Sequence, residues 1–165
     1  MTLAIAMLIA ERVKAELASH CERIEIAGSI RREKPEVGDI EIVAVPKPYD
    51  VGLFESGIAT IVSRWPKVKG ELPCKYTQRV LPEGINLDLF FATPDNWGVI
   101  YAIRTGSAEY SHRVLAAGWC RKGYRSEGGV LIDGKGREVH VREERDLFTL
   151  IGVPWTEPRR RTCDS

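Results

Sequence analysis

A glycine–serine turn with two arginines, residues 28–32, comes shortly before an apolar strand pattern that carries acids at alternate positions. The strand begins after Gly38 and reads Asp-Ile-Glu-Ile-Val. Asp39 and Glu41 are therefore expected on one face of the strand, with Ile40 and Ile42 in the core. Two neighbouring carboxylates repel each other unless a cation lies between them, and oxygen ligands suit Mg²⁺. The pattern predicts a half-buried strand with a divalent-cation site on its polar face.

Alternate acids on a strand most often mark only a solvated face. Three further features favour a site over that interpretation. The basic turn precedes the strand, a second acidic strand at residues 86–91 supplies Asp88, and a second Gly-Ser turn, Thr-Gly-Ser, occupies residues 105–107.

The composition limits the classes of protein that this chain can belong to. A chain of 165 residues suffices for one sizeable domain, or for a domain with a small appendage. The net charge of +1 argues against a uniformly basic nucleic-acid binder. Basic residues nevertheless crowd the second half, including a run at residues 159–161, and we expect that half to hold phosphates if nucleic acid binds. The alternatives are a solvated face and a disordered arginine tail.

The cysteines and the apolar N-terminal stretch indicate which metal ions the chain is not expected to bind and where in the cell the protein is expected. None of the four cysteines forms a Cys-x-x-Cys pair, which argues against zinc and favours reduced thiols in the cytoplasm. The apolar stretch at residues 3–9 is too short for a membrane span, so we expect no membrane partner. We expect a cytoplasmic monomer.

Hydrophobic periodicity predicts an α+β fold with a mixed β-sheet and helices on one face, followed by a small α+β subdomain. We expect the first domain over residues 1–95 and the second over residues 96–165. Trp97 and Trp119 are expected in the core. The expected helices cover residues 3–19, 53–65, 97–104, 108–121 and 143–151, and the expected strands cover residues 24–27, 39–45, 74–81, 87–92, 130–133 and 138–141.

With both Gly-Ser turns, the Gly-Asp pair at residues 38–39 and Asp88 in view, the chain resembles the family X DNA polymerases, the DNA polymerase beta-like nucleotidyltransferases. The resemblance runs from about residue 24 to residue 161. It includes Lys69-Gly70 and the closing motifs between residues 146 and 158. It implies a minimal polymerase with a nucleotidyltransferase palm and a carboxy-terminal subdomain, and without the family's amino-terminal lyase domain or helix-hairpin-helix region.

The resemblance implies a role for each candidate residue. Asp39, Glu41 and Asp88 would be catalytic and would hold two Mg²⁺ ions, with Mn²⁺ able to substitute, and Asp88 would be the general base. The incoming deoxynucleoside triphosphate would be bound by Gly28, Ser29, Arg32 and Gly38 at its phosphates and by Ile103, Arg104, Thr105, Gly106 and Ser107 at its sugar and base. The basic residues expected to contact primer-template or gapped DNA are Lys69, Arg113, Arg121, Lys122 and Arg125. Ser29 and Ser107 are equally good candidates for helix N-caps.

The chain departs from the family pattern in four places. Glu41 stands where the family has aspartate, which puts metal preference in question. Ile103 and Arg104 replace an aromatic pair that bears on sugar selection. Leu115 falls near the position of an arginine that senses the template base pair, so we expect low fidelity. Asn86 replaces the arginine two residues before the third carboxylate, which leaves open what orients Asp88.

These features leave three alternative functions. The first is a small DNA polymerase that adds deoxynucleotides to a primer 3′-hydroxyl in gap-filling repair and releases pyrophosphate. The second is a template-independent nucleotidyltransferase, either a terminal transferase or one that modifies RNA or a small molecule. The third is a non-catalytic nucleotide- or DNA-binding module, for which Glu41 is the only support.

Overall fold

The computed structural model describes residues 1–48 and 57–163. The protein is α+β, and it consists of two compact units, Met1–Ala92 and Thr93–Ser165. We describe each unit by itself. Within the described ranges, no helix has the length and apolar character needed to cross a membrane.

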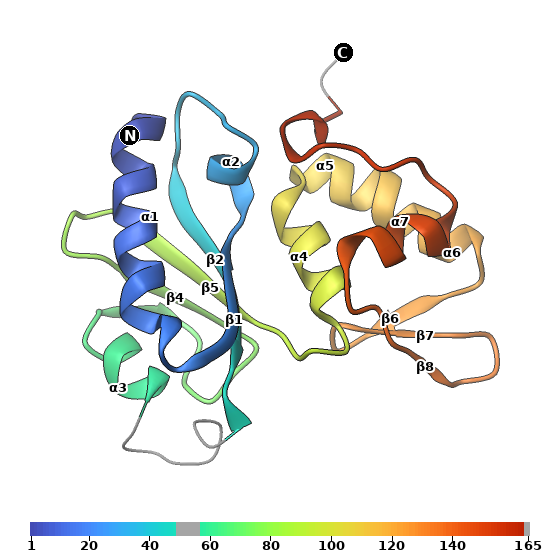
Figure 1. Ribbon diagram of the computed structural model, residues 1–165, viewed down its shortest axis with the longest axis horizontal. Coiled ribbons are helices and arrows are strands. Elements are labelled where there is room, and N and C mark those ends of the chain that lie inside the picture. The colour runs from blue at the N-terminus through green and yellow to red at the C-terminus, as the bar shows by residue number, and fades with distance from the viewer. Residues whose placement is uncertain (49–56, 164–165) are drawn as a thin grey trace. The chain divides into compact units, whose positions relative to one another are not determined.

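The described part of the first unit forms a mixed five-stranded sheet with the strand order β1-β2-β5-β4-β3 (Figure 1). Strands β2 and β5 are parallel, and the other neighbouring strands are antiparallel. Since β2 and β5 lie at the centre, each acidic strand is paired on both sides. The strands are β1 (Cys21–Ile26), β2 (Asp39–Pro46), β3 (Lys67–Lys69), β4 (Tyr76–Val80) and β5 (Asn86–Phe91).

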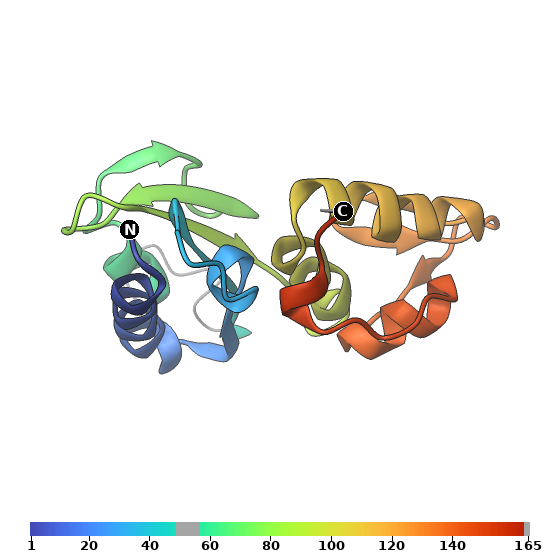
Figure 2. The same ribbon diagram turned by 90° about the horizontal axis from the view of Figure 1, so that it is seen from above.

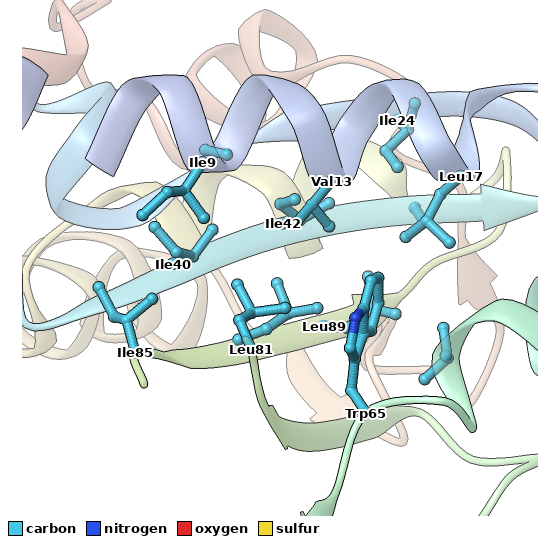
Figure 3. Packing of buried hydrophobic residues seen from close by; sticks show 14 of the residues in the cluster. Ile9, Val13, Leu17, Ile24, Ile40, Ile42, Trp65, Leu81, Ile85 and Leu89 are labelled. Carbon is cyan, nitrogen blue, oxygen red and sulfur yellow. The ribbon is translucent and has the colours of Figure 1, made fainter. Parts of the chain in front are cut away.

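Helices α1 (Leu3–Ala18) and α3 (Ile58–Val62) lie on the same side of this sheet (Figure 2). The apolar side chains of α1 pack against those of the central strands, and Trp65 closes the cluster beside α3 (Figure 3). The fully buried members from the strands include Ile40, Ile42, Leu87 and Leu89. Because these residues are buried, the residues that alternate with them along β2 and β5 lie on the other face of the sheet. A short helix, α2 (Gly28–Arg31), connects β1 to β2.

Some expected boundaries differ from the structure. The expected helix over residues 53–65 is helical over Ile58–Val62, and residues 49–56 lie outside the described residues. Residues 28–31, which we expected as a turn, form the single helical turn α2. The strand β3 was not expected, because three residues are too few to show an alternating pattern.

The second unit combines helices with a small antiparallel sheet. Its described residues form helix α4, a continuous helical stretch from α5 through a π-helical segment to α6, a three-stranded sheet in the order β6-β7-β8, and helix α7. The elements are α4 (Trp97–Thr105), α5 (Ala108–Tyr110), η2 (Ser111–Ala116), α6 (Ala117–Arg121), β6 (Arg125–Glu127), β7 (Val130–Ile132), β8 (Glu138–Val139), α7 (Glu144–Ile151) and the 3₁₀ turn η3 (Pro158–Arg160). Trp97 and Trp119 are both buried, which confirms that they are core residues.

A buried ion pair ties the last described segment to the core of the second unit. The guanidinium of Arg161 is fully buried and donates a hydrogen bond to the carboxylate of Glu144, at the start of α7. Its Nε atom also donates to the carbonyl oxygen of Thr156 at 2.9 Å. The same guanidinium lies 5.0 Å from the ring centroid of Phe148 and 4.7 Å from that of Trp155.

This arrangement corrects two interpretations of residues 159–161. They are not a disordered tail, and Arg161 does not belong to a phosphate-binding surface, because its charge is neutralised inside the unit. Three successive arginines carry no pattern that tells a buried member from its exposed neighbours. The backbone carbonyl of Arg161 also accepts a hydrogen bond from the N–H of Ser107 at 3.0 Å, so the ion pair helps to hold the Thr-Gly-Ser turn.

Replacement of Arg161 by leucine should lower the free energy of unfolding by about 3–5 kcal/mol, because Glu144 would remain buried without its partner. The double variant Glu144→Leu/Arg161→Leu should recover most of that loss, since both charges are removed together. Unfolding in urea measures both. Arg160→Leu, at an exposed neighbour, is the control and should change stability by less than about 0.5 kcal/mol. A double variant as unstable as the single one would show that the ring contacts, rather than charge pairing, hold the segment.

Candidate functional site

The three candidate acids lie on the sheet face opposite α1 and α3. Strands β2 and β5 run parallel with Glu41 directly beside Asp88 and with Asp39 beside Asn86. Their alternation with the buried residues Ile40 and Leu87 places all three carboxylate side chains on one face. The expected convergence of acids from two adjoining strands is therefore present in the backbone.

The carboxyl groups of Asp39 and Asp88 interact across the parallel strands β2 and β5. Burial raises the pKa of Asp39, and a hydrogen bond to Asp88 and the negative charge of Asp88 raise it further. Asp88 is 7 % exposed, so little water reaches the pair from its side. The folded protein therefore favours a proton on Asp39, and a cation bound beside it would relieve the same repulsion.

The third acid, Glu41, is placed differently. A Cβ atom added to Gly28 would come within 1.6 Å of Oε2 of Glu41, so this carboxylate lies directly against the α-carbon of the glycine. Gly28 also has φ = 62°, a left-handed conformation that side chains rarely adopt. The N–H of Ala27 donates to the carbonyl oxygen of Glu41 at 2.8 Å and holds the turn beside β2. Glycine at the turn and glutamate on the strand are therefore linked by packing.

The described residues contain no group of three or more histidine, cysteine, aspartate or glutamate side chains that could hold a metal ion. The expectation that three carboxylates gather at one point is not met in this conformation, because the Glu41 carboxylate lies at Gly28. The Asp39–Asp88 pair still fits Mg²⁺. This ion is usually bound by one or two carboxylates and completes its shell with water and substrate phosphates.

Two polar residues of β4 hold Asp88, and sequence reasoning did not find them. The phenol of Tyr76 donates to Oδ1 of Asp88 at 2.6 Å, and the amide Nε2 of Gln78 donates to the same oxygen at 2.8 Å. Gln78 and Asp88 are directly paired across the antiparallel strands β4 and β5. No sequence signal marked this face, because residues 76–79 are polar at every position, and only the strand register shows which acid Tyr76 and Gln78 meet.

The proposed phosphate-binding residues surround the turn before β2. Ser29 lies inside the first turn of α2, and the N-cap is Ala27, so the interpretation of Ser29 as an N-cap was wrong. Arg32 directly follows α2 and is half-buried. Gly38 is exposed, and a Cβ atom there would meet no described residue within 4 Å. Its backbone is thus open to a ligand.

The proposed sugar- and base-binding residues follow α4 in the second unit. Thr105 is fully buried, Ile103 packs against the core and Arg104 is exposed. Ser107 is the N-cap of α5, since its hydroxyl oxygen accepts from the N–H of Tyr110 at 3.1 Å. That confirms the capping interpretation for this serine. A Cβ atom at Gly106 would lie 2.8 Å from the Tyr110 ring, so glycine is required there for close packing.

The candidate DNA contacts are exposed and are divided between the units. Lys69 lies on the edge strand β3 of the first unit. In the second unit, Arg113 pairs with Glu109 at 2.7 Å and Arg125 pairs with Glu127 at 2.8 Å, so each shares its charge with an acid close to it in the sequence. Such exposed pairs are weak and can open to a phosphate. The remaining two candidates, Arg121 and Lys122, lie at the end of α6.

No family model matches the sequence, and no curated protein is significantly similar to it.

Replacement of Gly28 by alanine should lower the free energy of unfolding by about 2–4 kcal/mol, because it combines a left-handed backbone with a clash against Glu41. Gly38→Ala is the matched control, and it should change stability by less than about 0.5 kcal/mol. Chemical denaturation measures both. Gly28→Ala/Glu41→Ala should recover the steric part of the loss. If it recovers nothing, the backbone conformation alone requires glycine at this position.

Replacement of Asp39 by asparagine should raise the melting temperature at pH 7 in EDTA by about 2 °C. The reason is that the folded state raises the pKa of Asp39 above its ordinary value of 3.8, and asparagine can still donate a hydrogen bond to Asp88. In the natural protein, the contribution of the Asp39 carboxyl to folding stability falls as the pH rises from about 4 through the raised pKa. The difference between the variant and the natural protein should therefore grow across that window and vanish near pH 3. An equal difference at both ends would exclude titration of Asp39 as the cause.

Proposed function

We propose that the protein is a nucleotidyltransferase of the DNA polymerase beta-like kind that adds deoxynucleotides to a primer 3′-hydroxyl and releases pyrophosphate. The observation that carries the proposal is the Asp39–Asp88 pair on the neighbouring parallel strands β2 and β5. The Gly-Ser-Ile-Arg-Arg turn packs against β2, where Gly28 meets Glu41. Acids that adjoin a basic turn suit a substrate that brings both phosphate charge and a divalent ion.

Bound Mg²⁺ would supply neutralisation of the charge that develops on the attacking and leaving oxygens. Asp39 and Asp88 would hold it, since each offers carboxylate oxygens on the polar face of the sheet. Asp88 is also the best candidate to accept the proton of the primer hydroxyl, because it is buried and held in one orientation by two donors. Phosphoryl transfer depends mostly on such positioning and on charge stabilisation.

The turn before β2 would bind the β- and γ-phosphates. Gly38 leaves the backbone accessible, Ser29 offers a hydroxyl, and the guanidinium of Arg32 offers a fork of donors that matches phosphate oxygens. The carboxylate of Glu41 lies at this turn and would be repelled by an incoming triphosphate. We propose that it moves toward the Asp39–Asp88 pair when nucleotide and metal bind, and so supplies the third carboxylate.

The second unit would bind the nucleoside and the DNA, by the resemblance of its Thr-Gly-Ser turn and by its exposed basic residues. Thr105 is fully buried, so it would act by shaping the turn rather than through its side chain. Arg104 is exposed and already has a partner, so it would contact a ligand in addition to that partner. The engagement of Arg113 and Arg125 with neighbouring acids lowers the net positive charge offered to a duplex. This observation favours keeping the template-independent transferase as the second candidate.

Replacement of either Asp39 or Asp88 by alanine should reduce primer extension by roughly 10³-fold, because each removes a carboxylate from the proposed metal-binding pair. The assay supplies a gapped duplex, each of the four deoxynucleotides separately, and Mg²⁺ or Mn²⁺, with EDTA as a blank. Glu138→Gln, which removes an exposed acid on β8, is the control and should retain full activity.

Undiminished extension by either alanine variant would refute the metal assignment. A second arm replaces the gapped duplex with a single-stranded primer. Extension that depends on the duplex and follows the template base supports the polymerase. Equal extension of the single strand, with no effect of the template base, supports the template-independent transferase instead.

A further inference from the structure

Asp88 is the most constrained side chain of the candidate site. Two hydrogen bonds, from the Tyr76 phenol at 2.6 Å and from the Gln78 amide at 2.8 Å, converge on one oxygen atom, Oδ1. The other carboxylate oxygen, Oδ2, receives neither of these two bonds. One oxygen of Asp88 is therefore fixed by two side chains of β4.

The sheet register explains why these two residues reach the same atom. Gln78 lies directly opposite Asp88 across the β4–β5 pair, and Tyr76 lies opposite Phe90, two residues further along β5. Tyr76 is thus a diagonal neighbour of Asp88, a separation that an aromatic side chain can span. Its ring stacks on Phe90 with centroids 4.9 Å apart and an interplanar angle of 20°. The stack aims the phenol along the strand toward Asp88.

Both donors are electrically neutral. A phenol and an amide fix the carboxylate without cancelling its charge, whereas an arginine or lysine in their place would compete with a cation for it. The Asp39–Asp88 pair consequently keeps its negative charge for a divalent ion. Hydrogen bonds to a ligating carboxylate commonly matter to metal affinity or activity by 10- to 100-fold.

We infer that Tyr76 and Gln78 are positioning residues for Asp88, which they hold ready to bind the metal ion and to face the primer hydroxyl. This inference rests on the proposed function, since it assigns a supporting pair to the residue proposed as metal ligand and base. Tyr76 and Gln78 act through Asp88 and touch no reacting atom themselves. Asn86, the neighbour two residues earlier on β5, is paired in register with Asp39 and Val80.

The test measures Mn²⁺ affinity of the full chain by electron paramagnetic resonance, together with kcat and KM for primer extension. The variants are Tyr76→Phe, which keeps the ring stack, Gln78→Met, which keeps the volume, and both together. Each single variant should weaken Mn²⁺ binding, and the double variant should weaken it by about 10- to 100-fold, with a matching fall in kcat and little change in nucleotide KM. Tyr124→Phe, a tyrosine packed in the second unit, is the control and should bind Mn²⁺ as the natural protein does.

A repeat of the variants in an Asp88→Asn background separates positioning from a general effect on the fold. If Tyr76 and Gln78 act through Asp88, their replacement should change Mn²⁺ affinity little further once that carboxylate is gone. An equal effect in both backgrounds overturns the inference. So does natural affinity and kcat in the double variant, and in that case the proposed function stands. Absence of any Mn²⁺ binding by the natural protein overturns the proposed function and this inference with it.

Discussion

The parallel pairing of β2 with β5 is the constraint on which the candidate site depends. Its register places Glu41 beside Asp88 and sets Asp39 two pairs earlier, beside Asn86, so that all three acids share one face. Neither strand could keep this register without the opposite face, where Ile40, Ile42, Leu87 and Leu89 are fully buried under the helices. A slip of one residue would bury the acids and expose the core, so hydrophobic packing fixes the geometry of the carboxylates.

The charged form of Asp39 opposes folding, and this supports the proposal of a cationic ligand. The raised pKa of Asp39 means that the folded protein disfavours the charged form that water favours at neutral pH. A purely structural face would have little reason to keep two carboxyl groups in contact when an amide would serve. The divalent cation and substrate phosphates of the proposed function would remove the repulsion and, by binding to the folded state, would stabilise it.

Much of the fold could be predicted from the sequence, because long periodic segments report directly on burial. Helix α1, the central strands and helix α7 follow from such patterns, and so does the shared face of Asp39 and Glu41. The site was less predictable. The hydrogen bonds of Gln78 to Asp88 and of Arg161 to Glu144 join residues that are 10 and 17 positions apart, and no local pattern encodes such register. The sequence shows that position 41 carries the longer acid, glutamate, but only the three-dimensional structure shows that its carboxylate contacts Gly28.

The two Gly-Ser turns are stabilised by the same two kinds of interaction, close packing at a glycine and a backbone hydrogen bond. At each, glycine permits a close approach that any side chain would block: Glu41 against Gly28 in the first unit, and Tyr110 against Gly106 in the second. A backbone hydrogen bond from a segment remote in sequence then fixes each turn, between Ala27 and Glu41 in one case and between Ser107 and Arg161 in the other. Turns that are already fixed lose little conformational entropy on binding a ligand. The same residues that make these motifs conspicuous in the sequence therefore also fix their conformation, which suits the nucleotide-binding role proposed for them.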